Sequence, residues 1–254
     1  MQKQFFTEAI SLEIFETISK ASQQLGLESY VIGGFVRDYF LKRGTAKDID
    51  IVTIGSGIDL AEKVSSLLSN KPKVQIFKTY GTAMLRYKDI EIEFVGARKE
   101  SYSEESRNPE VSEGNLQDDQ NRRDFTINAL ALSLNEANFG ELLDPFNGID
   151  DLGNGILRTP LNPDITYSDD PLRMMRAIRF ASQLNFKIEK KSLAAITKNS
   201  ERLEIITRER IVDELNKVMS CEKPSIGFLL LEETKLLAQI IPELIDLKGV
   251  EEVE

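Results

Sequence analysis

A chain of 254 residues can bury the core of one or two domains, and its 41% hydrophobic and 29% charged residues are ordinary for a globular protein. It has no histidine and one cysteine, which excludes a Ser-His-Asp triad, a histidine-ligated zinc site and an intrachain disulfide; any metal must be held by oxygen. Without a secretory signal or an apolar run near the roughly 18 residues of a membrane span, we expect a cytoplasmic protein with no membrane partner.

The net charge of −10 argues against a nucleic-acid partner, but the charge is unevenly distributed. Residues 100–119 contain seven acidic residues and one basic residue, Arg107, and so contribute −6. This segment is also rich in Ser, Asn and Gly, which predicts a mobile loop. The remainder of the chain is nearly balanced, so net charge does not exclude RNA.

The first 150 residues alternate helical and strand patterns. Hydrophobic residues at Ile10, Ile14, Ile18 and Ala21 predict a helix that stops near Gly26. The patterns that follow predict strands over 29–34, 48–55, 73–79, 82–87 and 90–95, helices over 35–44, 58–70 and 126–132, and a hairpin that closes at 142–148.

From about residue 150 the strand patterns stop. Amphipathic helices are predicted over 169–184, 191–199, 208–219 and 225–237. The order predicts an α+β head over residues 1–150, followed by a helical region over residues 151–254.

The carboxylates of Asp48 and Asp50 lie on one predicted strand and share one face, opposite Ile49 and Ile51. Two carboxylates this close repel each other unless a cation lies between them, and magnesium is the obvious candidate. Glu91 and Glu93 share a face of a later strand, and either could supply the third carboxylate of a two-metal site. Taken alone, such a pair more often marks a solvent-facing strand edge.

Gly33 and Gly34 end a predicted strand and open a helix about 15 residues before the carboxylates. Amides at a helix N-terminus bind phosphate, and Arg37, one turn later, can add charged hydrogen bonds. The alternatives are a tight turn for the glycines and a surface position for the arginine.

Six segments occur in one order: VIGGFVRDYFLKR, DIDIVT, IEIEFVGAR, RRDFTINALAL, LLDPFNGIDDL and DDPLRMMRAIRFA. Over about residues 30–185 this series resembles the class II tRNA nucleotidyltransferases, the CCA-adding enzymes, and the closely related bacterial poly(A) polymerases. The resemblance implies a polymerase beta-like nucleotidyltransferase head with a mixed sheet and flanking helices, then an all-helical neck and the start of a body.

The resemblance also implies roles for residues of the head. Asp48 and Asp50 would hold two magnesium ions, with Glu93 rather than Glu91 as the third carboxylate. Gly33, Gly34 and Arg37 would hold the triphosphate. The element Arg122, Arg123, Asp124 and Asn128 would contact the sugar of the incoming nucleotide, although Asp124 could equally cap a helix that starts near Thr126.

Asp170 and Arg173 lie three residues apart on one predicted helix face, with Asp170 as N-cap and Pro171 first in the helix. The residues alone predict only a helix cap, Asp170, and an ion pair between Asp170 and Arg173. The resemblance implies instead a protein template that selects C or A by hydrogen bonds to the base, supported by Arg176 and Arg179. Asp169 departs from the family, which usually has glutamate there.

The implied activity is template-independent addition of CCA to the 3′ end of tRNA, with CTP and ATP as substrates and no protein partner. A poly(A) polymerase, an enzyme adding only CC or only A, and a non-catalytic nucleotide- or RNA-binding module remain alternatives. The family's body and tail would extend beyond this chain. A histidine-dependent phosphohydrolase domain is not expected within it.

Overall fold

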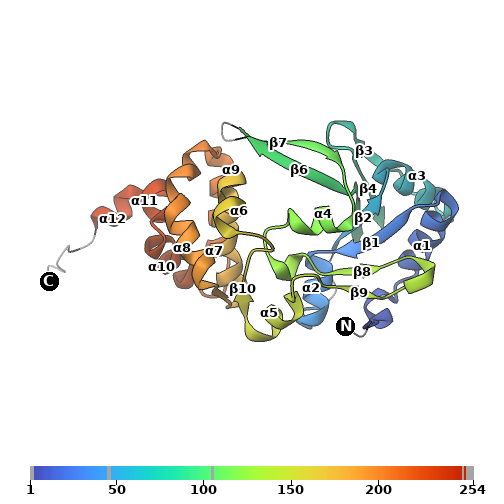
Figure 1. Ribbon diagram of the computed structural model, residues 1–254, viewed down its shortest axis with the longest axis horizontal. Coiled ribbons are helices and arrows are strands. Elements are labelled where there is room, and N and C mark those ends of the chain that lie inside the picture. Colours follow the sequence, from blue (N-terminus) through green and yellow to red (C-terminus); the bar gives the residue numbers. More distant parts are fainter. Residues whose placement is uncertain (1–2, 45–46, 104–105, 248, 250–254) are drawn as a thin grey trace. The chain divides into compact units, whose positions relative to one another are not determined.

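The computed structural model describes residues 3–44, 47–103, 106–247 and 249. Side chains are described for all of these except residues 100–110. The chain divides into two compact units (Figure 1). Unit 1 comprises Met1–Ser101 and Glu110–Leu152, and unit 2 comprises Tyr102–Pro109 and Gly153–Glu254.

Unit 1 is built on a seven-stranded sheet in the order β3-β4-β5-β2-β1-β8-β9. The strands β2 and β5 pair in parallel and the other neighbours pair antiparallel, so the predicted mixed sheet is confirmed. The strands are β1 (Glu28–Ile32), β2 (Asp48–Ile54), β3 (Gln75–Phe77), β4 (Thr82–Tyr87), β5 (Ile90–Gly96), β8 (Ala131–Ser133) and β9 (Leu142–Leu143).

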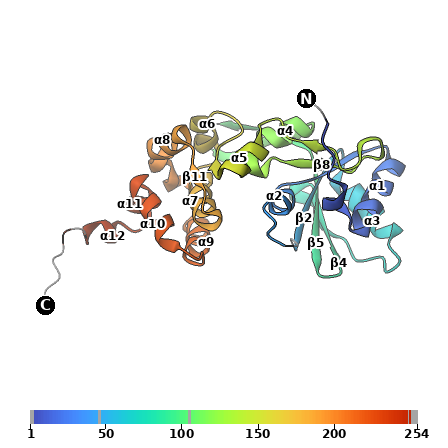
Figure 2. The same cartoon turned by 90° about the horizontal axis from the view of Figure 1, so that it is seen from below.

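Helices α1 (Glu13–Leu25) and α3 (Gly57–Leu67) pack against each other, and α3 packs on β2, β4 and β5 (Figures 1 and 2). Strand side chains alternate between two faces, and the buried isoleucines Ile49, Ile51 and Ile92 all take the same one. The helix α1 ends at Gly26 in the left-handed region, as predicted. Shorter helical segments of unit 1 are η1 (Thr7–Ile10), α2 (Gly34–Phe40), η2 (Lys78–Tyr80), η3 (Thr126–Asn128), η4 (Glu136–Asn138) and α5 (Gly148–Asn154), which crosses the unit boundary.

The acidic segment is structured, so the prediction of a loop over 100–119 is wrong for most of its length. Strands β6 (Arg98–Ser103) and β7 (Ser106–Glu113) form a two-stranded sheet, and α4 (Leu116–Asn121) follows. Asn115 and Asp118 form a capping box that stabilises the start of this helix. Glu104 and Glu105 lie outside the described residues.

The prediction of a helix over 126–132 is also wrong. Its first residues form the single turn η3, and its last enter the strand β8, which pairs with β1 and β9. Pairing of Leu132 with Val31 buries both side chains and overrides the helical preference of the segment. The predicted hairpin is confirmed as β8–β9.

Unit 2 is mainly helical, with a short parallel pair β10 (Ile156–Leu157) and β11 (Lys187–Ile188). The predicted helix over 225–237 is broken in two at Lys235, whose positive φ of 64° interrupts the helical backbone. No described helix has the length and apolarity that a membrane crossing demands. The helical segments are α6 (Pro163–Asp169), α7 (Leu172–Leu184), α8 (Lys190–Asn199), η5 (Ser200–Ile205), α9 (Arg208–Met219), α10 (Pro224–Glu233), α11 (Leu236–Ile240) and α12 (Pro242–Asp246).

Candidate active site

Four carboxylates lie on one face of the two parallel strands β2 and β5. Asp48 is in register with Glu91, and Asp50 with Glu93. Residues paired across a ladder project to the same face, so all four face away from the isoleucine core. The register puts Glu93 beside the more buried aspartate, while Glu91 stands beside the exposed one.

These carboxylates suit a hard divalent cation by their chemistry. Burial raises the pKa of Asp50; Arg123 partly offsets that increase, and the negative charges of Asp119 and Asp48 add to it. A cation bound between the carboxylates would relieve both the repulsion and the burial cost. Among the described residues, however, no three Asp, Glu or Cys side chains are close enough together to form a metal cluster.

Gly33 lies directly under the site at the end of β1, with φ 84° and ψ −134°. A Cβ placed there would lie 2.9 Å from Arg123 Nη1 and 3.3 Å from Asp50 Oδ2. A side chain is therefore excluded by two groups of the predicted site. The Gly33 amide donates to the Leu130 carbonyl at 3.2 Å, so the phosphate-binding prediction rests on Gly34 and the turn that follows.

Arg37 is buried and belongs to a side-chain network. Its Nη1 donates to Asn128 Oδ1 at 2.8 Å, and Nε and Nη2 pair with the Asp38 carboxylate at 2.9 and 3.0 Å. Asn128 Nδ2 in turn donates to Asp124 Oδ1 at 2.9 Å. The structure thus joins Arg37, one of the predicted triphosphate residues, to Asn128 and Asp124, two of the four residues predicted to contact the sugar.

Asp124 accepts a hydrogen bond from the amide of Phe125 at 2.8 Å, which satisfies a backbone donor just before η3. No side-chain cap bond is formed at the N-cap of η3, Phe125. Capping of a helix near Thr126 by Asp124 is therefore not the geometry found. Its carboxylate is instead tied to Asn128.

Asp119 lies beside the candidate site and was not among the residues predicted from the sequence. Its side chain is fully buried, with Oδ2 accepting from Arg123 Nε at 3.1 Å and Oδ1 accepting from Arg122. Burial opposes its ionisation, but the Arg123 and Arg122 charges outweigh burial and lower the pKa of Asp119. The signal was the spacing of Asp119, three and four residues before two arginines, which is the spacing of helical ion pairs.

The predicted template residues lie in unit 2, where α7 begins. Arg173 Nε is 3.8 Å from Asp170 Oδ2, and Asp170 Oδ1 accepts from the Leu172 amide at 3.2 Å. The helix begins one residue later than predicted, with Pro171 as its N-cap. Burial raises the pKa of Asp169, and the positive charges of Arg173 and Arg202 partly offset this increase.

Arg176 and Arg179 both lie over the ring of Phe180, with their guanidinium carbons 5.5 and 4.0 Å from its centroid. Arg179 also donates to Glu214 Oε2 of α9 at 2.7 Å. The Glu214 side chain is 4% exposed, so this pair joins α7 to α9 in a largely buried position.

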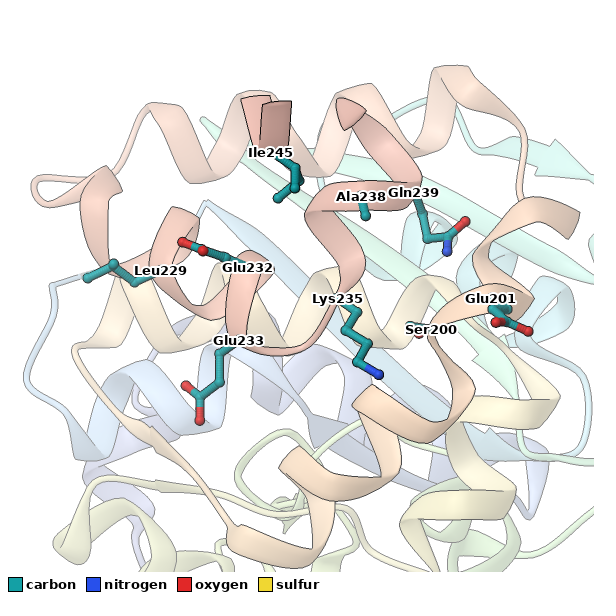
Figure 3. Close-up of a pocket in the computed structure, with 9 residues that line it drawn as sticks. All are labelled: Ser200, Glu201, Leu229, Glu232, Glu233, Lys235, Ala238, Gln239 and Ile245. Atoms are coloured by element: carbon teal, nitrogen blue, oxygen red, sulfur yellow. The ribbon is translucent and has the colours of Figure 1, made fainter. Parts of the chain in front are cut away.

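A pocket of about 580 Å³ lies in unit 2 between η5, α10, α11 and α12 (Figure 3). Its charged lining residues are Glu201, Glu232, Glu233 and Lys235. Three carboxylates against one ammonium are unsuited to a triphosphate. None of the predicted site residues lines this pocket.

A family model described as Poly A polymerase head domain matches residues 29–158, and one described as a probable RNA and SrmB binding site of polymerase A matches residues 185–247. The CCA-adding enzyme of Enterococcus faecalis is 40% identical over 76% of this chain and 46% of its own length. The A-adding tRNA nucleotidyltransferase of Halalkalibacterium halodurans is 32% identical over 87% of this chain and 52% of its own.

Among solved structures, the Thermotoga maritima CCA-adding enzyme complexed with tRNA aligns with a TM-score of 0.81 at 30% identity. The alignment covers 96% of this chain and 57% of that one. The chain therefore spans about half of the length of these relatives.

Proposed function

The chain belongs to the family of the poly(A) polymerase head domain and the class II CCA-adding enzymes, and from this we propose that it is a CTP/ATP:tRNA nucleotidyltransferase that builds or repairs the 3′-terminal CCA. Unit 1 would be the catalytic head and unit 2 the neck and the start of the RNA-binding body. The observation that carries the proposal is the parallel register of β2 and β5, which puts Asp50 beside Glu93 on one open face.

Members of this family depend on divalent metal ions, and we propose two magnesium ions held by Asp48 and Asp50, with Glu93 as the third carboxylate. When bound, they would favour ionisation of the RNA 3′-hydroxyl and stabilise the departing pyrophosphate. The protein itself needs no covalent intermediate, since positioning and electrostatics suffice for phosphoryl transfer.

The incoming nucleotide would lie on the β1 side of Asp50. Arg123 lies over Gly33 next to Asp50, where its positive charge can meet a phosphate oxygen or the sugar. Arg37 would orient Asn128 and Asp124, and the Asp124 carboxylate could accept from a ribose hydroxyl. A deoxynucleotide would leave that acceptor without its donor, which favours ribonucleotides.

Base selection is proposed for Asp170 and Arg173, whose side chains adjoin at the start of α7. Arg173→Ala should reduce discrimination between CTP and UTP by about tenfold or more, because a donor to the base is lost, and should change triphosphate binding less. Single-nucleotide incorporation with each NTP measures the ratio. Normal discrimination by this variant would contradict the template assignment.

Primer extension on a tRNA lacking its CCA end tests the activity, with magnesium and CTP, ATP or both. Addition of two C residues and then a single A would support CCA addition. A long A tail made from ATP alone would identify a poly(A) polymerase, and addition of only CC or only A a partial enzyme. Nucleotide binding without extension, also in the full-length protein, would favour a non-catalytic module.

A further inference from the structure

The β3–β4 hairpin has a charge opposite to that of the whole chain. Residues 71–88 contain five basic and no acidic residues, in a protein whose net charge is −10. The five are Lys71, Lys73, Lys78, Arg86 and Lys88. A basic segment in an acidic protein indicates a polyanionic partner at that place.

The hairpin continues the face of the sheet that holds the carboxylates. Gln75 pairs with Met84, Met84 with Glu93, and Glu93 with Asp50, so these four residues form one row across four strands. Paired residues of a ladder project to the same side. The carboxylate face therefore extends over β4 to the edge strand β3.

Arg86 lies in the neighbouring row, where it pairs with Glu91, which pairs with Asp48. Its side chain is exposed, and no ion pair is found between Arg86 and any described acidic residue, although Glu91 stands opposite. Phe77, two residues after Gln75, takes the same face and is 43% exposed. A cation and an aromatic ring thus lie along one exposed surface.

We propose that this surface binds the single-stranded 3′ end of the RNA that is extended, which presupposes the function proposed above. Arg86 would contact a phosphate near the terminus, and Phe77 would stack on a base. Tyr80, which is 72% exposed after β3, and the hairpin lysines would continue the contact.

The order of the strands separates the two substrates. Gly33 follows β1, on one side of β2, whereas β5, β4 and β3 lie on the other side. A nucleotide bound over Gly33 and Arg123 would leave the β4–β3 side for the RNA strand. Neighbouring strands lie about 4.8 Å apart, so β3 is roughly 14 Å from β2, within the reach of the last few nucleotides of a strand whose 3′-hydroxyl is at Asp50.

A protein partner that adds a strand to β3 fits less well. The strand is only three residues long and is flanked by lysines, and both features discourage edge-to-edge pairing. Exposed aromatic rings interspersed with cations are typical of single-stranded nucleic-acid binding.

The test compares Arg86→Ala and Phe77→Ala with two matched controls, Lys20→Ala on α1 and Phe5→Ala, which remove an exposed cation and an exposed phenylalanine elsewhere in unit 1. Binding of a fluorescent single-stranded oligoribonucleotide ending in CC is measured by anisotropy. We expect Kd to rise about tenfold in each hairpin variant and less than twofold in the controls. In a plot of log Kd against log salt, Arg86→Ala should lower the slope by about 0.7 and Phe77→Ala should not.

Arg86→Lys should retain most of the RNA affinity, and this rescue would not be expected if Arg86 had only a structural role. Thermal melting verifies that each variant folds. In primer extension, KM for RNA should rise while KM for ATP stays unchanged. Unchanged RNA affinity in both variants overturns the proposal, as does a rise in KM for ATP alone. Because oligonucleotide binding needs no turnover, failure of the proposed activity would be seen separately, as absent extension by the wild-type protein.

Discussion

The carboxylates of Glu93 and Glu91 lie on the same face of β5 but adjoin different aspartates, Asp50 and Asp48. If Asp50 and Glu93 share a metal, Glu93→Gln should lower kcat by on the order of 10³-fold, since the loss of one metal contact removes several kcal/mol of transition-state stabilisation. Glu91→Gln is the matched control and should lose less than about tenfold. Single-turnover primer extension measures both, and the reverse order would reassign the third carboxylate.

Asp119 should matter for stability as well as for the position of Arg123. Asp119→Asn removes the buried charge that both arginines face, and we expect a loss of about 3 kcal/mol in the free energy of unfolding at pH 7. The pKa of Asp119 is lowered in the folded state, so its contribution is present above the unfolded pKa of about 3.9 and is lost as the pH falls through the lower, folded value.

The difference between wild type and Asp119→Asn should therefore shrink in acid. Denaturant unfolding at pH 7 and at pH 3 measures it, with Asp89→Asn in the turn between β4 and β5 as an exposed control. An equal difference at the two pH values would show that the charge of Asp119 is not what stabilises the fold.

Residues that act through local spacing could be predicted from the sequence, and those that act through the tertiary fold could not. The alternation of Asp48 and Asp50 with isoleucines is a property of one strand, so their common face followed directly. The spacing of Asp119 from Arg122 and Arg123 is a local signal for the ion pairs, but the complete burial of Asp119 depends on the tertiary fold and has no local signal. The bond from Arg37 to Asn128 spans 91 positions of sequence and has no local signal.

At the scale of elements, the turn between β1 and α2 depends on the absence of a side chain at Gly33. Gly33→Ala should destabilise the fold by about 2 kcal/mol, because its backbone conformation is strained for alanine and the added Cβ would lie 2.9 Å from Arg123 Nη1. Gly26→Ala is the control: it has a positive φ but no atom within 4 Å of the added Cβ, and should cost about 1 kcal/mol. Thermal melting compares them, and KM for ATP should rise in Gly33→Ala only.

Elements with a strong periodicity, such as α1, α3 and α7, were predicted close to their observed bounds. The errors arose where partners decide the conformation. The segment around Leu132 became a strand because β1 offered an edge to pair with. The helix after Pro224 broke at Lys235, whose positive φ has no signal in the local sequence pattern. Short helices such as α4 and α6 depend on caps from Asn115 and Asn162 rather than on an apolar stripe.

At the scale of the whole molecule, we expect removal of metal to abolish catalysis and to leave the fold intact. A chain without histidine and with one cysteine has no means of building a structural zinc site, so chelation should abolish nucleotide transfer while the melting temperature changes by less than about 2 °C. Extension assays and thermal melting with EDTA, and with magnesium restored, measure the two effects. Unfolding on chelation would mean that the metal is part of the fold.

The parallel pairing of β2 with β5 has a consequence for how such a protein can evolve. A shift of one position along β2 would turn Asp48 and Asp50 inward and bring Ile49 and Ile51 to the surface, and a shift along β5 would do the same with Glu91, Glu93 and Ile92. The hydrophobic core therefore penalises any change in how the four carboxylates align. Insertions and deletions within these two strands should therefore be rare among functional descendants. The short edge strand β3 carries no such penalty, because all three of its residues are exposed, so its length and composition can change at little cost to the core.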